Sequence, residues 1–215
     1  MTTNPSAENQ SQAQPAVIEP GFEMAAHAFW EKNRSFIILV CAAALLIIIG
    51  REGWQYYTAQ HEKSVRNEYA KIADHPEQLA AFAAANSDHA LAGVAYLRIA
   101  DTKYAAGDFR SAAENYTKAS ASLKNPALLG RAKIGAAMSQ LNSGAKIAGE
   151  TALKGVGADA TLPKNVRAEA TYHLATLAFE AGNAADVSRL VAEVSKIELS
   201  GLWAQRATAL LTIKP

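Results

Sequence analysis

The chain has 215 residues, half of them hydrophobic, and a formal net charge of +1. This length accommodates one domain of ordinary size and an additional segment. Residues 1–31 carry four acidic and no basic side chains, whereas residues 57–215 carry eighteen basic and fifteen acidic ones. Such a small positive surplus is typical of a mixed solvated surface, so we expect no nucleic-acid partner.

Residues 1–21 are polar and contain three prolines. They lack the apolar side chains that would offset the entropy of ordering, so we predict a disordered tail. Residues 22–34 place Phe22, Phe29 and Trp30 at helical spacing. This pattern predicts a short amphipathic segment near a membrane surface, and a plain extension of the following helix is the alternative.

Residues 35–53 are predicted to form a transmembrane helix. The run from Ser35 to Gly50 has no charged side chain and would span roughly 24 Å, slightly less than a hydrocarbon core of about 30 Å. A buried core helix is the alternative. Flanking aromatic and arginine side chains can close the gap at the two interfaces. The predicted membrane-anchor residues are Trp30, Arg34, Arg51, Trp54 and Tyr57.

We expect this helix to remain as an anchor, because about 34 residues precede it and no small-x-small cleavage site follows it. Cys41, within the span, is interpreted as a small packing residue. Positive charges nearly balance across the span and do not set its orientation. A short cytoplasmic tail with an exported domain is the usual single-pass arrangement, and we adopt it as a hypothesis.

Residues 54–89 are predicted to form juxtamembrane helices. The first continues from the span and ends at Asp74-His75-Pro76, because proline favours the first turn of a new helix. Ser87-Asp88 is predicted to cap the helix that follows. The predicted buried face of the second juxtamembrane helix comprises Leu79, Ala80, Phe82 and Ala83.

The stretch from Ala90 to Ser120 predicts a helical hairpin. Apolar side chains recur at helical spacing on both sides of Gly107-Asp108, a dipeptide that predicts a turn. Ala100 and Ala112 allow two antiparallel helices to approach closely. One hairpin cannot bury both of its faces, so this one predicts neighbouring hairpins.

The order of aromatic, aliphatic and small residues around this turn resembles the tetratricopeptide repeat, whose unit is roughly 34 residues. Lys103, where a tyrosine is common, departs from the repeat pattern. Any alanine-rich helical hairpin is the alternative explanation. The matching positions are Tyr96, Ile99, Ala100, Gly107, Phe109, Ala112, Tyr116 and Ala119.

Two degraded copies follow. Residues 163–195 repeat the small-residue seam and the turn at Leu174-Ala175 and Gly182-Asn183. The loop from Gly155 to Pro163 is expected to be flexible, and Leu199 to Leu211 is predicted to be a terminal helix that covers the open end of the array.

The copy between them allows two registers. Aligning Gly144 with Gly107 places Lys133 at a packing position, whereas aligning Ile134-Gly135 with Ile99-Ala100 lengthens the turn. We favour the second register, because a lysine ammonium in a helix seam costs more than two extra turn residues.

No segment alternates with period two, so we expect no sheet. The predicted fold is all-α: a single N-terminal transmembrane helix followed by tetratricopeptide-like repeats over residues 90–215 with a C-terminal capping helix. The five histidines are scattered, and no phosphate loop or nucleophile elbow is present. We therefore expect no enzyme activity, cofactor, metal site or small-molecule substrate.

The resemblance to tetratricopeptide repeats implies a protein-binding groove lined by the first helix of each hairpin. These positions carry few charges, which favours an apolar or amphipathic segment of another protein as ligand. The alternative is that several of these side chains pack against the adjoining helix. The groove residues carried over from the family are Val94, Leu97, Asp101, Tyr104, Tyr172, Thr176 and Phe179.

The whole arrangement, with Gly53-Trp54-Gln55-Tyr56-Tyr57 after the span, resembles the bacterial YfgM family, the ancillary subunit of the SecYEG translocon. The resemblance covers roughly residues 22–215. It implies a protein of the bacterial inner membrane with its N-terminus in the cytoplasm and its repeats in the periplasm. The implied partners are the translocon and a periplasmic chaperone of the PpiD type, to which emerging secreted proteins would be handed.

Other classes of function are open at this point. The same fold could serve as an adaptor of another cell-envelope or division complex. A sensor whose tail signals in the cytoplasm and an enzyme with an unrecognised site are further alternatives.

Overall fold

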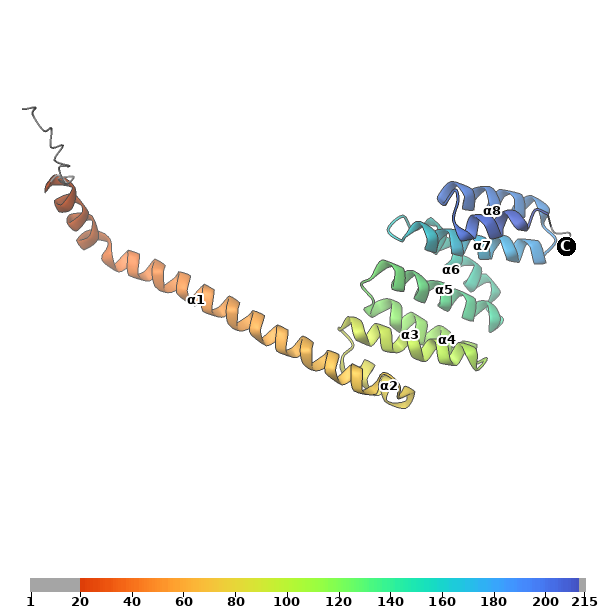
Figure 1. Cartoon of the computed structure of the whole chain (residues 1–215), viewed down its shortest axis with the longest axis horizontal. Helices are drawn as coiled ribbons and strands as arrows, with labels where there is room; N and C mark the ends of the chain where they lie inside the picture. Colours follow the sequence, from red (N-terminus) through yellow and green to blue (C-terminus); the bar gives the residue numbers. More distant parts are fainter. Residues whose placement is uncertain (1–19, 213–215) are drawn as a thin grey trace, which may run out of the picture. The chain divides into compact units, whose positions relative to one another are not determined.

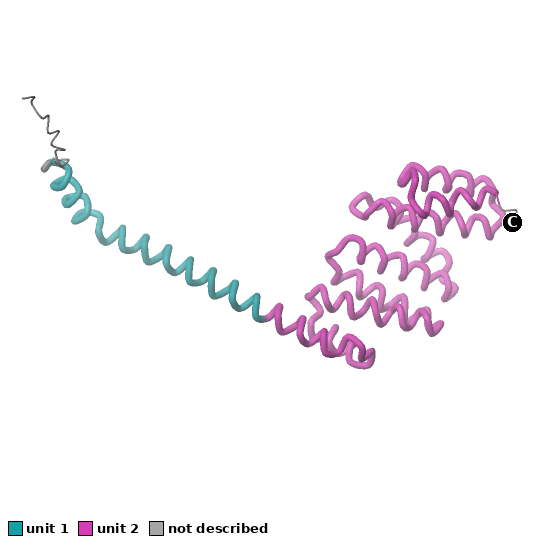
Figure 2. Tube along the Cα trace, in the orientation of Figure 1, with its two compact units in different colours: residues 1–60 teal, residues 61–215 magenta. Residues whose placement is uncertain are grey.

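A computed structural model describes residues 20–212, and these residues form helices and short connections without any strand. The chain divides into two compact units, residues 1–60 and residues 61–215 (Figure 2). The prediction of an all-α fold is confirmed. The predicted disordered tail lies outside the described residues, except that residues 20 and 21 already belong to the first helix.

Helix α1 (Pro20–Ile72) is continuous over 53 residues and passes through the expected boundaries at residues 34 and 53. Among the described helices, it alone is long and apolar enough to cross a membrane. None of its apolar window is buried inside the protein, which excludes the alternative of a buried core helix. The expected anchor residues, all exposed on this helix, are Trp30, Arg34, Arg51, Trp54 and Tyr57.

Residues 61–72 of α1 belong to the second unit, where Val65 is buried with α2 (Pro76–Ala85) and α3 (Ala90–Ala105). Leu79, Phe82 and Ala83 of α2 are buried as predicted, but Ala80 is exposed. The buried residues Leu79, Phe82 and Ala83 follow the i, i+3 and i+4 spacing of one helix face. Ala80 comes directly after Leu79, so its side chain is rotated by about 100° around the helix axis, away from that face.

Three hairpins follow in chain order (Figure 1). Each packs against the next, so that the first helices α3, α5 and α7 contact one another in sequence. Helix α9 contacts α7 and α8 and buries Ala204 and Ala207 in the core of the last two hairpins. The hairpins are α3 with α4 (Phe109–Ser122), α5 (Pro126–Asn142) with α6 (Lys146–Ala158), and α7 (Lys164–Glu180) with α8 (Ala184–Ile197), followed by α9 (Leu202–Ala209).

The three hairpin turns have the same geometry. Gly107, Gly144 and Gly182 have φ of 77°, 89° and 70°, a region that residues with a Cβ rarely adopt. In the first turn, the amide of Asp108 donates to the carbonyl of Lys103 at 3.0 Å and that of Gly107 donates to Tyr104 at 3.0 Å. Equivalent bonds occur in the other two turns, so each helix ends in a Schellman motif.

This shared turn corrects the register that we favoured for the second hairpin. Its turn is no longer than that of the first, and Gly144 aligns with Gly107. In that alignment Ala137 occupies the place of Ala100, and both have no exposed surface. Lys133 is tolerated at the packing position because its side chain is 37% exposed and its Nζ lies 3.1 Å from Asp159 Oδ2.

Two local expectations were wrong. Helix α6 extends to Ala158, so the predicted loop from Gly155 shrinks to residues 159–163. The N-cap of α3 is His89 rather than Ser87-Asp88: its Nδ1 accepts from the amide of Leu91 at 3.0 Å. Because Nδ1 accepts, Nε2 donates to Glu62 Oε2 at 2.8 Å, and this hydrogen bond lowers the pKa of Glu62.

Candidate functional site: the face of the first helices

We call the surface shared by α3, α5, α7 and α9 the first-helix face. The corrected register places Val94 of α3, Arg131 of α5 and Glu169 of α7 at equivalent positions, each 13 residues before the turn glycine of its hairpin. The same repeat position therefore carries an apolar side chain in the first hairpin, a cationic one in the second and an anionic one in the third. The face is more polar than the groove residues predicted from the sequence, because that prediction takes its positions from the first and third hairpins and includes neither Arg131 nor Glu169.

Asp101 joins two hairpins on this face. Its Oδ2 accepts from Arg131 Nη2 at 2.6 Å and its Oδ1 accepts from the hydroxyl of Tyr116 at 2.7 Å. Tyr116 is buried, and burial followed by the hydrogen bond to this carboxylate raises the pKa of Tyr116. Arg131 is 60% exposed, so its charge is available to a ligand even while it is paired.

Glu169 continues the row between two arginines. Its carboxylate is attracted by Arg206 of α9 and by Arg131, but burial is the stronger effect and raises the pKa of Glu169. His173, one turn further along α7, has its Nε2 4.0 Å from Glu169 Oε1. Burial, with a smaller contribution from the positive Arg206, lowers the pKa of His173.

Helix α9 adds an aromatic group to this end of the face. Trp203 lies with its ring centroid 5.3 Å from that of Tyr172 and 5.9 Å from that of His173. The guanidinium of Arg206 lies 5.0 Å from the Trp203 ring centroid, within the range of a cation–π interaction. The terminal helix therefore both covers the end of the core and supplies side chains to the face.

At the turn end of the face, Tyr104 bridges two hairpins. Its hydroxyl accepts from Asn142 Nδ2 at 2.8 Å, and its ring packs edge-on against Phe109 at a centroid distance of 5.2 Å. These contacts hold the ring at the edge of α3, where it is half-buried.

The structure places the seven expected groove residues unequally. Leu97 is 4% exposed and belongs to the core, so it offers no surface to a ligand. Tyr172 packs against Trp203, and Thr176 donates its hydroxyl hydrogen to the carbonyl of Tyr172 at 3.2 Å. The other six predicted groove residues are half-buried on the first helices, and several of them pack against the hydrophobic core: Val94, Asp101, Tyr104, Tyr172, Thr176 and Phe179.

Sequence reasoning did not select Arg131, Glu169, Trp203 or Arg206. The sequence does contain a signal for Arg131 and Glu169, because each lies as far before its turn glycine as Val94 lies before Gly107. Nothing local signals Trp203 or Arg206, because they reach the face only when α9 folds back against α7.

The described residues contain no group of three or more His, Cys, Asp and Glu side chains placed to hold a metal ion. The arrangement on the first-helix face consists of salt bridges, hydrogen bonds and stacked rings. Groups of these kinds are the ones through which proteins recognise one another's side chains by charge and shape.

A comparison with protein families matches residues 27–161 to the tetratricopeptide repeat-like domain family. The chain belongs to this family. The match begins within α1 and ends in the loop before α7, so it covers two of the three hairpins of this tetratricopeptide repeat-like protein. Searches of curated proteins and of solved structures found no match. The family and the fold indicate a scaffold for protein–protein interaction.

Proposed function

We propose that this protein is a membrane-anchored scaffold that binds other proteins on its first-helix face. The observation that carries the proposal is the row of Asp101, Arg131, Glu169 and Arg206 across four helices, beside the stacked rings of Tyr172 and Trp203. The exposed apolar stretch of α1 supports the anchor, since such a surface is stable in a bilayer and not in water.

Within that role, the resemblance to the YfgM family supports a more specific proposal. The protein is an ancillary subunit of the SecYEG translocon in the bacterial inner membrane, with residues 1–21 in the cytoplasm and residues 90–215 in the periplasm. It pairs with a membrane-anchored periplasmic chaperone of the PpiD type and assists the transfer of secreted proteins to it.

The first test is topology. Alkaline phosphatase fused after Pro215 is expected to be active, because the enzyme matures only outside the cytoplasm. An inactive fusion that is present at normal level would place the repeats in the cytoplasm and refute the handover role.

The second test locates the binding face. A photocrosslinking residue at Tyr104 is expected to capture a translocon subunit or the chaperone, and one at Glu114, exposed on α4, is not. Arg131→Glu should lower the Tyr104 crosslink at least several-fold, while Arg110→Glu, exposed on α4, leaves it unchanged. Crosslinks to other envelope proteins with no translocon subunit would instead identify an adaptor of a different envelope or division complex.

A further inference from the structure

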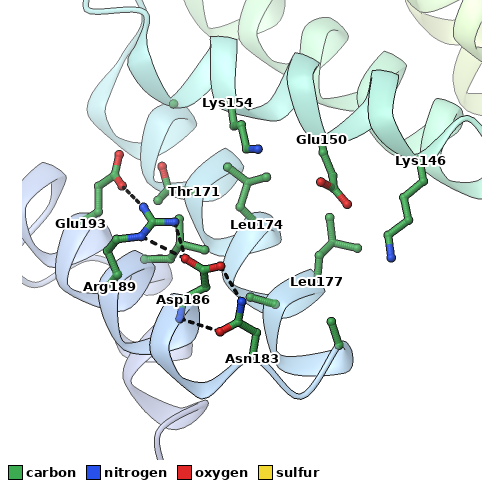
Figure 3. Close-up of a pocket in the computed structure, with 14 residues that line it drawn as sticks. Lys146, Glu150, Lys154, Thr171, Leu174, Leu177, Asn183, Asp186, Arg189 and Glu193 are labelled. Carbon is green, nitrogen blue, oxygen red and sulfur yellow. Dashed lines mark hydrogen bonds and ion pairs between the residues drawn. The ribbon is translucent and has the colours of Figure 1, made fainter.

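A second concave surface lies on the opposite helices of the last two hairpins. It is a groove of about 400 Å³ between α6 and α8, with α7 as its floor (Figure 3). Helices α6 and α8 each contact α7 but not one another within the described residues, so the floor between them stays open. We call this surface the α6–α8 groove.

The floor is aliphatic and specific to the third hairpin. Leu174, Leu177 and Ala178 of α7 form it, and Leu177 is only half-buried. Aligned by the turn glycines, the residue of α5 equivalent to Leu177 is Ser139, which has no exposed surface. The preceding hairpin thus closes over this position, and the last one leaves a large apolar side chain accessible.

The two walls differ in the state of their charges. On α8, Arg189 is held by Asp186 at 2.8 Å and lies 3.8 Å from Glu193, so the charged side chains of this wall pair with one another and carry one excess negative charge. On α6, Lys146, Glu150 and Lys154 point into the groove (Figure 3). None of these three has an ion pair or side-chain hydrogen bond to any other described residue.

The spacing of the free charges defines the ligand. Lys146, Glu150 and Lys154 follow one another at i, i+4 and i+8, so they form one stripe of alternating charge with steps of about 6 Å along α6. A partner helix lying alongside presents its own i, i+4 and i+8 positions at the same steps. An extended peptide would leave its backbone amides and carbonyls unpaired over the aliphatic floor, whereas a helix satisfies them internally.

We propose that the α6–α8 groove binds an amphipathic helix of another protein that carries an acidic, a basic and an acidic side chain at i, i+4 and i+8. Leucine-like side chains beside this stripe contact Leu174 and Leu177. The pattern reads the same in both directions, so parallel and antiparallel docking are both accommodated. This site is separate from the first-helix face, and the proposal does not depend on the translocon role.

Close packing fixes the position of α6, so its stripe of charges is held in one place for a ligand to bind. A Cβ at Gly149 would lie 2.8 Å from the carbonyl oxygen of Ala137, and one at Gly157 would lie 2.8 Å from Thr171 Oγ1. These glycines let α6 approach α5 and α7 closely, so the wall of the groove is held by direct backbone packing.

The test uses the full chain in nanodiscs and designed, fluorescently labelled helical peptides. One peptide has the glutamate–lysine–glutamate stripe beside leucines, a second has the charges reversed, and a third has a central proline. Fluorescence anisotropy should show saturable binding of the first, binding about tenfold weaker for the second, and loss of binding for the third.

The variant Lys146→Glu/Glu150→Lys/Lys154→Glu should invert the preference between the first two peptides. Lys196→Glu, exposed on α8 outside the groove, makes the same net charge change and should leave the preference intact. No saturable binding below about 1 mM, or equal affinity for both charge patterns, would overturn the proposal. Crosslinking from Tyr104 tests the first-helix face and peptide binding tests the α6–α8 groove, so either proposal can be refuted without the other.

Discussion

At the scale of single residues, glycines and one histidine carry the most testable consequences. Gly130 illustrates close approach: a Cβ there would lie 2.4 Å from Val166 Cγ1, within the contact between the second and third hairpins. Gly155, in the interior of α6, has nothing within 4 Å of a Cβ. The same residue type therefore serves packing at one position and only weakens a helix at the other.

Gly130→Ala should lower the free energy of unfolding by about 1–3 kcal/mol, because the added methyl group must displace Val166 in a packed seam. Gly155→Ala is the matched control and should raise it by about 0.5–1 kcal/mol, the usual advantage of alanine in a helix interior. Urea unfolding of the full chain in nanodiscs, followed by circular dichroism, measures both. Equal effects of the two substitutions would contradict the contact assigned to Gly130.

His173 predicts a pH dependence of stability. Its pKa in the folded chain lies below the ordinary value of 6.5, because burial and then Arg206 disfavour the imidazolium. The unfolded chain therefore takes up this proton at a higher pH than the folded chain. The stabilisation is complete above pH 6.5 and is lost as the pH falls through the lowered pKa. Glu169, whose pKa is raised, acts in the opposite direction at lower pH.

The slope of stability as the pH falls below 6.5 should accordingly become shallower in His173→Gln, whatever the change in absolute stability. His75→Gln provides the control, since the His75 side chain is 55% exposed. Thermal unfolding at several pH values below 6.5 gives both slopes. Parallel curves for the natural chain and His173→Gln would show that this histidine does not titrate differently on folding.

At the scale of elements, the hairpin turns determine the register of the array. Their Schellman motifs require a positive φ at one residue, so each hairpin is pinned by one glycine. The seam alanines Ala100, Ala137 and Ala175 then fall at the same distance before each turn and are all buried. Arg131 and Glu169 reach the first-helix face through this common geometry.

Gly144→Ala should destabilise the chain by about 1–2 kcal/mol, because alanine is strained at a φ of 89°. The neighbouring Ser143, with φ of −82°, offers a control in Ser143→Ala, which should change stability by no more than about 0.5 kcal/mol. The free energy of unfolding from urea titration distinguishes them. If Gly144→Ala were harmless, the shared turn geometry would not be what sets the register.

At the scale of the whole molecule, the second unit presents two chemically different faces. The first-helix face combines paired charges with stacked rings, and the α6–α8 groove combines free charges with an aliphatic floor. A repeat array produces this division because its first and second helices face opposite sides. One scaffold could in this way hold two partners at once, which suits a protein that we propose to act in handover.

The amino-acid sequence by itself determined the helices of this protein. The signals for these helices are local, and each can be recognised from a few neighbouring residues. They are the apolar run in α1, the prolines and turn glycines that mark helix ends, and the small residues where α3 and α4 pack together. The all-α class, the repeat architecture and most helix bounds follow from these signals.

Only the tertiary structure decided which side chains meet. The local sequence predicts a high cost for Lys133 at a packing position, because it does not reveal the partner Asp159, which follows 26 residues later. Asp101 and Arg131 are likewise 30 residues apart, and Trp203 reaches Tyr172 only through the return of α9. Helical periodicity in the sequence predicts which face of a helix is apolar. It does not predict which polar groups pair, because that depends on packing between residues far apart in the chain.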